Sequence, residues 1–207
     1  MKRLIITLLL LGLSVFIGFK LIKYFFIENS IEKYTDVINY DKYKKELIKN
    51  LDVQSSLYIF PENVELDNVV KFNYMKEDGL FEGGYILFLE YQYDNDSYKK
   101  EIERLKEIRS NILGNQKKIL YTEDGFNYPA YITIFDGIGS YEYALVDRDN
   151  LKIIYVFDQI LNINEIDEVY RPVNYKVPVD NRDIKKSGFN IYYHYDYNGT
   201  GINIKEV

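Results

Sequence analysis

The sequence predicts an α+β fold: an N-terminal transmembrane helix, then one domain with an antiparallel sheet covered by helices on one face. Three observations predict it: a hydrophobic run near the N-terminus, one segment with a clear helical period, and several short β-rich runs separated by turn residues. The runs come in the order strand, strand, helix and then several strands. Because parallel strands need a long crossover between them, this order favours antiparallel pairing.

The N-terminal hydrophobic segment has the features of a membrane anchor. Lys2 and Arg3 precede residues 4–26, which are mostly apolar. A segment of about 20 such residues is long enough to span the hydrocarbon core of a bilayer. Lys20 and Lys23 lie near its far end, where long cationic side chains can reach the headgroups. We therefore expect residues 4–26 to hold the chain in the membrane.

A cleaved signal peptide is the alternative for this segment. Such a peptide needs small residues just before the cut, and Gly12 and Ser14 offer one such site. A cut there would leave the apolar residues 15–27 as a new N-terminus, so we expect an uncleaved signal-anchor. Basic residues followed by a hydrophobic run are the pattern of an export signal. This pattern predicts a single-pass protein of the cell membrane, with the C-terminal domain outside the cytoplasm.

The chain divides into three expected parts. Residues 1–27 form the transmembrane anchor, residues 28–51 a helical stalk and packing helix, and residues 52–207 the α+β extracytoplasmic domain. The spacing of apolar residues in the second part predicts two helices, and Asp41 is suited to begin the second one. The charged side chains of that helix, Lys44 among them, are expected to face solvent.

The first half of the domain combines a strand pair with a helix. Residues 70–74 alternate apolar and polar side chains and residues 85–93 are almost wholly apolar or aromatic, so the two are expected to pair antiparallel. Apolar residues recur at helical spacing over residues 98–112, with Asp96 and Ser97 as candidate caps. The charged residues of this helix, including Glu101 and Arg104, are expected on its solvated outer face.

The second half is expected to be a meander of strands. A tight hairpin is predicted around residues 148–150, and residues 162–187 are expected to form a long loop with a short helix near residues 165–169. The predicted strands are residues 118–122, 130–135, 141–146, 151–157 and 189–197.

Composition restricts the partners of the domain. All 32 acidic residues follow residue 27, whereas four of the 26 basic ones precede it, which leaves 22 basic against 32 acidic residues and a net charge of −10. This charge argues against nucleic acid as the partner. The absence of cysteine excludes disulfides, thiolate metal sites, a cysteine nucleophile and a lipid-modified cysteine.

His194 is the only histidine and the first candidate for chemistry. On a strand it shares a face with Tyr192 and Asp196. It could act as a general base with Asp196 nearby. However, same-face neighbours two residues apart lie about 7 Å from each other, and no serine is marked as a nucleophile. We therefore expect a half-exposed strand and assign no catalytic residue, with His194, Asp196 and Tyr192 as weak candidates.

No cofactor or metal is expected. Asp196, Asn198, Thr200 and Gly201 match positions 1, 3, 5 and 6 of a calcium loop, but Val207 stands where a bidentate glutamate is required. The 22 tyrosines could stack on sugar rings, yet tyrosine equally covers a core with its hydroxyl in water. Neither pattern is specific enough to assign a ligand.

The overall layout resembles small uncharacterised single-pass membrane-anchored proteins of AT-rich bacteria. The resemblance rests on the basic start, the single hydrophobic helix, Phe60-Pro61-Glu62-Asn63, the strand pair within residues 72–93 and the helix at 98–112. It implies membrane localisation and carries no known activity or site residue.

The expected function is that of a membrane-tethered extracytoplasmic binding or interaction module that is not an enzyme. Its partner would be the membrane, through residues 4–26, and a protein of the cell envelope. Two alternatives stay open: a cell-envelope hydrolase that uses carboxylates and His194, and an accessory subunit of a membrane complex.

Overall fold

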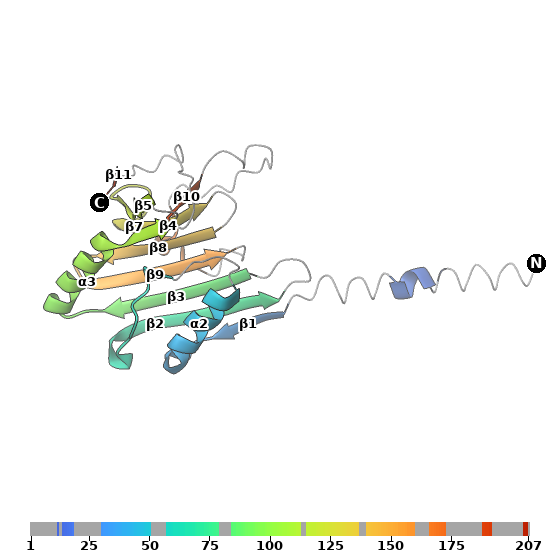
Figure 1. The fold of residues 1–207 in the computed structure, drawn as a ribbon. Coiled ribbons are helices and arrows are strands. Elements are labelled where there is room, and N and C mark those ends of the chain that lie inside the picture. Colours follow the sequence, from blue (N-terminus) through green and yellow to red (C-terminus); the bar gives the residue numbers. More distant parts are fainter. Residues whose placement is uncertain are drawn as a thin grey trace, which may run out of the picture.

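The structure is a computed structural model that describes residues 12, 14–18, 30–50, 57–78, 84–112, 115–136, 140–159, 166–172, 188–191 and 205–206. Its main feature is a nine-stranded sheet in the order β1-β2-β3-β9-β8-β7-β6-β11, with β10 paired to β7 (Figure 1). The strands are β1 Ser30–Tyr34, β2 Val69–Asp78, β3 Gly84–Gln92, β6 Leu120–Thr122, β7 Ala130–Asp136, β8 Ser140–Asp147, β9 Lys152–Gln159, β10 Gly188–Asn190 and β11 Lys205–Glu206. All these pairings are antiparallel, as predicted.

Two α-helices lie over the same face of this sheet, α2 Tyr40–Asn50 and α3 Asn95–Glu107 (Figure 1). Tyr43 of α2 packs on β2, with its ring 4.7 Å from that of Tyr74 and 6.1 Å from that of Phe72. Short 3₁₀ helices are found at η1 Val37–Asn39, η2 Leu66–Asn68 and η4 Glu168–Tyr170, and a separate hairpin joins β4 Arg109–Ile112 to β5 Asn115–Lys118. The predicted α+β class is therefore confirmed, with more strand than helix.

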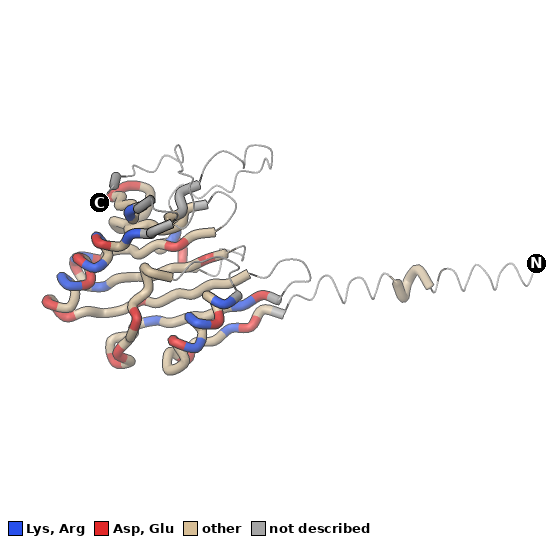
Figure 2. The backbone as a smooth tube through the Cα atoms, in the orientation of Figure 1, with Lys and Arg blue, Asp and Glu red and all other residues tan. Residues whose placement is uncertain are grey.

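Loop segments cover the other face of the sheet. The ring of Phe126 lies 4.9 Å from that of Tyr143, and the ring of Tyr170 lies 5.6 Å from that of Phe88. The hydroxyl of Tyr143 donates to the backbone carbonyl of Tyr170 at 2.8 Å. Because both faces are covered, the central strands β3, β8 and β9 are buried along most of their length and carry near-continuous apolar runs. Figure 2 shows the charged residues mainly along the two helices and the turns.

Strand β1 replaces the first helix that the sequence predicts after the anchor. Ser30–Tyr34 pairs with the second half of β2, and the ring of Tyr34 lies 5.1 Å from that of Tyr43 and 6.0 Å from that of Tyr74. The local spacing of apolar residues is compatible with a helix. Pairing with a distant strand overrides that local preference.

Helix α3 starts and ends earlier than the sequence predicts. Its cap is Asp94, whose carboxylate accepts hydrogen bonds from the backbone N–H groups of Asp96 and Ser97, both at 2.9 Å. At the other end Ile108 adopts extended backbone geometry and is buried in the core. The residues that follow pair as β4 with β5, so the predicted helical run to residue 112 is wrong beyond residue 107.

The chain enters the domain at one end of the sheet. The start of β1 and the start of β3 both pair with the end of β2, through Ser30 with Asp78 and Gly84 with Glu77. The start of β8 pairs with the ends of β7 and β9, through Ser140 with Asp136 and Gln159. These strand ends therefore lie along the same edge of the sheet. The turn between β8 and β9 lies at the opposite end, next to the pairing of residues 147 and 152.

Most of the expected anchor lies outside the described residues. Residues 14–18 are helical, and Val15, Phe16 and Ile17 are exposed. Within the part of the chain that the structure describes, no helix combines the length and the apolar character needed to cross a membrane.

Asp158 is a carboxyl group that the sheet buries. It lies on β9 between Ile86 and Tyr141, its residue is 2% exposed, and its Oδ1 has no hydrogen-bond partner among the described residues. Burial raises the pKa of Asp158 to about 7. The folded protein therefore holds this proton more tightly than the unfolded chain does.

We predict that Asp158 makes the free energy of unfolding fall as pH rises from about 4 to about 7. The pKa of Asp158 is higher in the folded protein than in the unfolded chain. The stability that the protonated carboxyl contributes is therefore lost as pH rises through the pKa of the folded protein. Asp158→Asn should remove this slope and gain up to about 4 kcal/mol over the wild type at alkaline pH, at about 1.4 kcal/mol per pKa unit. Urea titrations across this pH range measure it.

Asp149→Asn, in the exposed β8–β9 turn, controls for the loss of one negative charge. Equal pH slopes in Asp158→Asn and the wild type would contradict the assignment.

Candidate functional site

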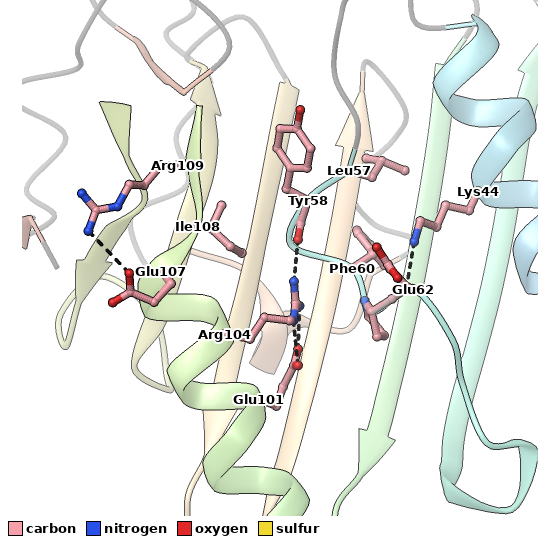
Figure 3. A pocket seen from close by; sticks show the side chains of 11 residues that line it. Lys44, Leu57, Tyr58, Phe60, Glu62, Glu101, Arg104, Glu107, Ile108 and Arg109 are labelled. Carbon is pink, nitrogen blue, oxygen red and sulfur yellow. Dashed lines mark hydrogen bonds and ion pairs between the residues drawn. The ribbon is translucent and has the colours of Figure 1, made fainter. Parts of the chain in front are cut away.

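An open groove of about 770 Å³ lies between α2 and α3 on the helix-covered face (Figure 3). Residues 57–62 cross the sheet between the two helices, and we call this segment the strap. The groove is lined by Lys44 of α2, by the strap residues Leu57, Tyr58, Phe60, Pro61 and Glu62, and by Glu101, Arg104, Glu107, Ile108 and Arg109 on and just after α3. Ligand pockets commonly have volumes of about 300 to 1,000 Å³, so this groove is large enough to be one.

Apolar side chains hold the strap on the sheet. Leu57, Ile59 and Phe60 are almost fully buried, and the ring of Phe60 lies 5.7 Å from that of Tyr155 on β9. Leu57 has a φ of 48°, in the left-handed region that costs a residue with a side chain free energy. The burial of its side chain compensates for that cost.

The two helices bind the backbone carbonyls of the strap from opposite sides. Arg104 of α3 donates from Nη1 to the carbonyl of Tyr58 and from Nη2 to that of Ile59, both at 2.7 Å. On the α2 side, the Tyr40 hydroxyl and Lys44 Nζ both donate to the carbonyl of Pro61, at 2.7 and 2.8 Å. The distance between the helices is thereby fixed through the strap.

Glu101 links Arg104 to the centre of the sheet. Arg104 donates from Nε and Nη2 to the two carboxylate oxygens of Glu101, at 2.7 and 2.6 Å. The Tyr155 hydroxyl donates to Oε1 of Glu101 at 2.5 Å, and the hydroxyls of Tyr93 and Tyr155 are 2.7 Å apart. Since Tyr155 donates to Glu101, Tyr93 is the donor to Tyr155. The result is a buried network of one ion pair and two phenols.

The electrostatics of the network keep it in one protonation state. Burial raises the pKa of Tyr155 well above its ordinary value and also raises that of Tyr93, so both stay protonated donors. Burial alone would lower the pKa of Arg104, but the hydrogen bonds and charge of Glu101 raise it overall. At the groove wall, burial lowers the pKa of Lys44. The network is suited to holding a shape, because its carboxylate is already paired with a cation and a phenol.

The candidate residues from the sequence lie elsewhere. His194, Asp196 and Tyr192 are outside the described residues, as is most of the calcium-like pattern. Nearby, β10 ends at Asn190, and the next residue, Ile191, is buried and donates from its backbone N–H to the carbonyl of Thr133 at 3.0 Å. Among the residues that the structure describes, no group of three or more His, Asp or Glu side chains is placed to hold a metal ion.

The charged groove residues on the helices were expected on solvated faces, and for Glu101 that expectation is wrong. Glu101 is 8% exposed. Its position supplies the signal that could have identified it, since Tyr98, Glu101 and Leu105 follow one another at helical spacing and share the buried face of α3. A carboxylate on that stripe needs a partner, and Arg104 lies three residues further on.

Comparison of the chain with protein-family models, with curated proteins and with solved structures finds no match. The functional argument therefore depends on the geometry of this chain.

We predict that Arg104→Met lowers the free energy of unfolding by about 3 kcal/mol, since it leaves the buried carboxylate of Glu101 without its half-buried cationic partner. Two carbonyls of the strap also lose their donor. Urea denaturation of the purified protein measures the loss.

Lys106→Met is the matched control, because Lys106 Nζ pairs with the exposed Glu103 at the same spacing on the same helix, at 3.0 Å. Its loss should change stability by less than about 0.5 kcal/mol. Equal effects of the two substitutions would show that the network does not stabilise the fold.

Proposed function

We propose that this chain is a membrane-tethered extracytoplasmic interaction module, without enzymatic activity, that binds a cell-envelope partner in the groove between α2 and α3. One observation carries the proposal. The polar groups deepest in the groove, Glu101 and Arg104, are engaged with each other, with Tyr155 and with the strap. They give the groove a fixed shape in advance of binding, which reduces the entropy lost when a partner binds.

The accessible surface of the groove supports binding of a protein segment. Tyr58 lines the groove and is 44% exposed, and tyrosine is enriched where proteins meet. Charged side chains of both signs also line the groove: Glu62 on the strap, and Glu107 and Arg109 with 3.5 Å between their closest atoms. An accessible aromatic side chain together with charged side chains is typical of sites that bind proteins.

The N-terminal segment supports the tether. Val15 and Phe16 are 66% and 61% exposed, in a hydrophobic segment that carries no acidic residue. Such apolar surface is stable in contact with lipid and costs free energy in water.

We predict that a single cysteine at Asp149, in the exposed β8–β9 turn, is labelled in intact cells by a membrane-impermeant thiol reagent. The wild-type chain contains no cysteine, so it provides the unlabelled background. Lys2→Cys, before the hydrophobic segment, should be labelled only after the cells are broken. The reverse pattern would place the domain in the cytoplasm and exclude an envelope partner.

We predict that a photo-crosslinking amino acid at Tyr58 of the full chain forms an adduct with an envelope component in living cells. The same amino acid at Val169, which is similarly exposed on the loop-covered face, is the matched control and should form none. Gel shifts and mass spectrometry of the membrane fraction measure both. Equal adducts at the two positions, or none at Tyr58, would remove the groove as the binding site.

A further inference from the structure

A second pocket of about 400 Å³ lies on the other side of α3, between this helix and strands β6, β7 and β8. It is lined by Tyr98, Ile102 and Lys106 of α3, Tyr121 of β6, Tyr131 of β7, Val146 of β8 and Arg148 of the β8–β9 turn. Residues 98, 102 and 106 form one stripe of the helix, whereas the groove uses its residues 101, 104 and 107. The two sites are therefore separated by α3, and a ligand could occupy this pocket whether or not the groove is filled.

The walls of the pocket are aromatic and its rim is cationic. The rings of Tyr121 and Tyr131 lie 5.0 Å apart, and Ile102 and Val146 add aliphatic surface. Arg148 Nη2 donates to the Tyr121 hydroxyl at 2.7 Å, which holds the guanidinium beside the rings. The Arg148 side chain is 60% exposed, so its other N–H groups stay accessible.

Nearby acids compensate these cations only in part. Arg148 lies 3.5 Å from Glu123, at the outer limit of an ion pair, and Lys106 lies 3.0 Å from Glu103. Each cation carries more N–H donors than these contacts use. The rim therefore presents an excess of hydrogen-bond donors over acceptors.

Tyr98 contributes to the wall of the pocket, while its hydroxyl is buried away from solvent. Tyr98 is 9% exposed, and its hydroxyl has no hydrogen-bond partner among the described residues. Burial raises the pKa of Tyr98 to about 12, so the hydroxyl keeps its proton at neutral pH. A buried polar group without a partner destabilises a fold, so this hydroxyl reduces stability.

We propose that this pocket binds a small organic carboxylate with a ring or a short apolar chain. Arg148 would pair with the carboxylate in the bidentate geometry that a planar guanidinium offers. The rings of Tyr121 and Tyr131 would enclose the apolar part of the ligand. A single negative charge suits the site, because the surrounding acidic domain repels multiply charged anions such as phosphates.

The test uses the full chain purified in detergent and 3-phenylpropionate as the probe, with the neutral 3-phenylpropanamide as its matched control. Ligand-observed NMR titration should detect binding of the acid and at least tenfold weaker binding of the amide. Arg148→Gln should weaken acid binding at least tenfold. Arg109→Gln, which removes an arginine at the groove, should leave acid binding unchanged.

Tyr98→Phe separates binding from folding. It should leave acid binding unchanged and raise the Tm of the ligand-free protein, because it removes a buried hydroxyl that lacks a partner and keeps the ring in the pocket wall. Equal binding of acid and amide, undetectable binding of the acid, or wild-type affinity in Arg148→Gln would each overturn the proposal.

Discussion

The guanidinium group of Arg104 joins parts of the molecule that are distant in sequence. It contacts a carboxylate on its own helix and two carbonyls of the strap, and through Glu101 it reaches Tyr155 at the centre of the sheet. Because α2 holds the same strap through Tyr40 and Lys44, the positions of both helices depend on this one side chain. The buried ion pair thus contributes to the geometry of the site as well as to stability.

Burial of the sheet on both faces determines where sites can form. The loop-covered face is closed by aromatic contacts such as Phe126 with Tyr143. The helix-covered face has only two α-helices over a wide sheet in the part of the chain that the structure describes (Figure 1), and a pocket lies on each side of α3. The groove lies on one side and the tyrosine-lined pocket on the other. Both sites therefore have the same cause, because two helices do not cover the whole width of the sheet.

Local signals in the sequence predicted the centre of the fold. The antiparallel pair β2–β3 and the β8–β9 hairpin are confirmed, because turn residues and apolar runs specify them over short distances. Strand β1 was missed because its pairing with β2 spans some 45 residues of chain. At the groove, Glu101 and Arg104 have the spacing of a solvated ion pair, and although Glu101 falls on the apolar stripe of α3, the contacts with the strap and Tyr155 join residues distant in sequence and could not be predicted.

In the proposed tethered protein, the position of Ser30 would restrict how far the domain can move from the membrane. If residues 4–26 span a bilayer as we propose, three residues separate the lipid from the first strand, a distance of at most about 10 Å. The strands themselves extend about 30 Å at 3.3 Å per residue. A domain tethered in this way would stay within a thin layer above the lipid surface, so a partner would itself have to be anchored, inserted or concentrated there. The short connection would thus limit which molecules the domain encounters before any contact in the groove is made.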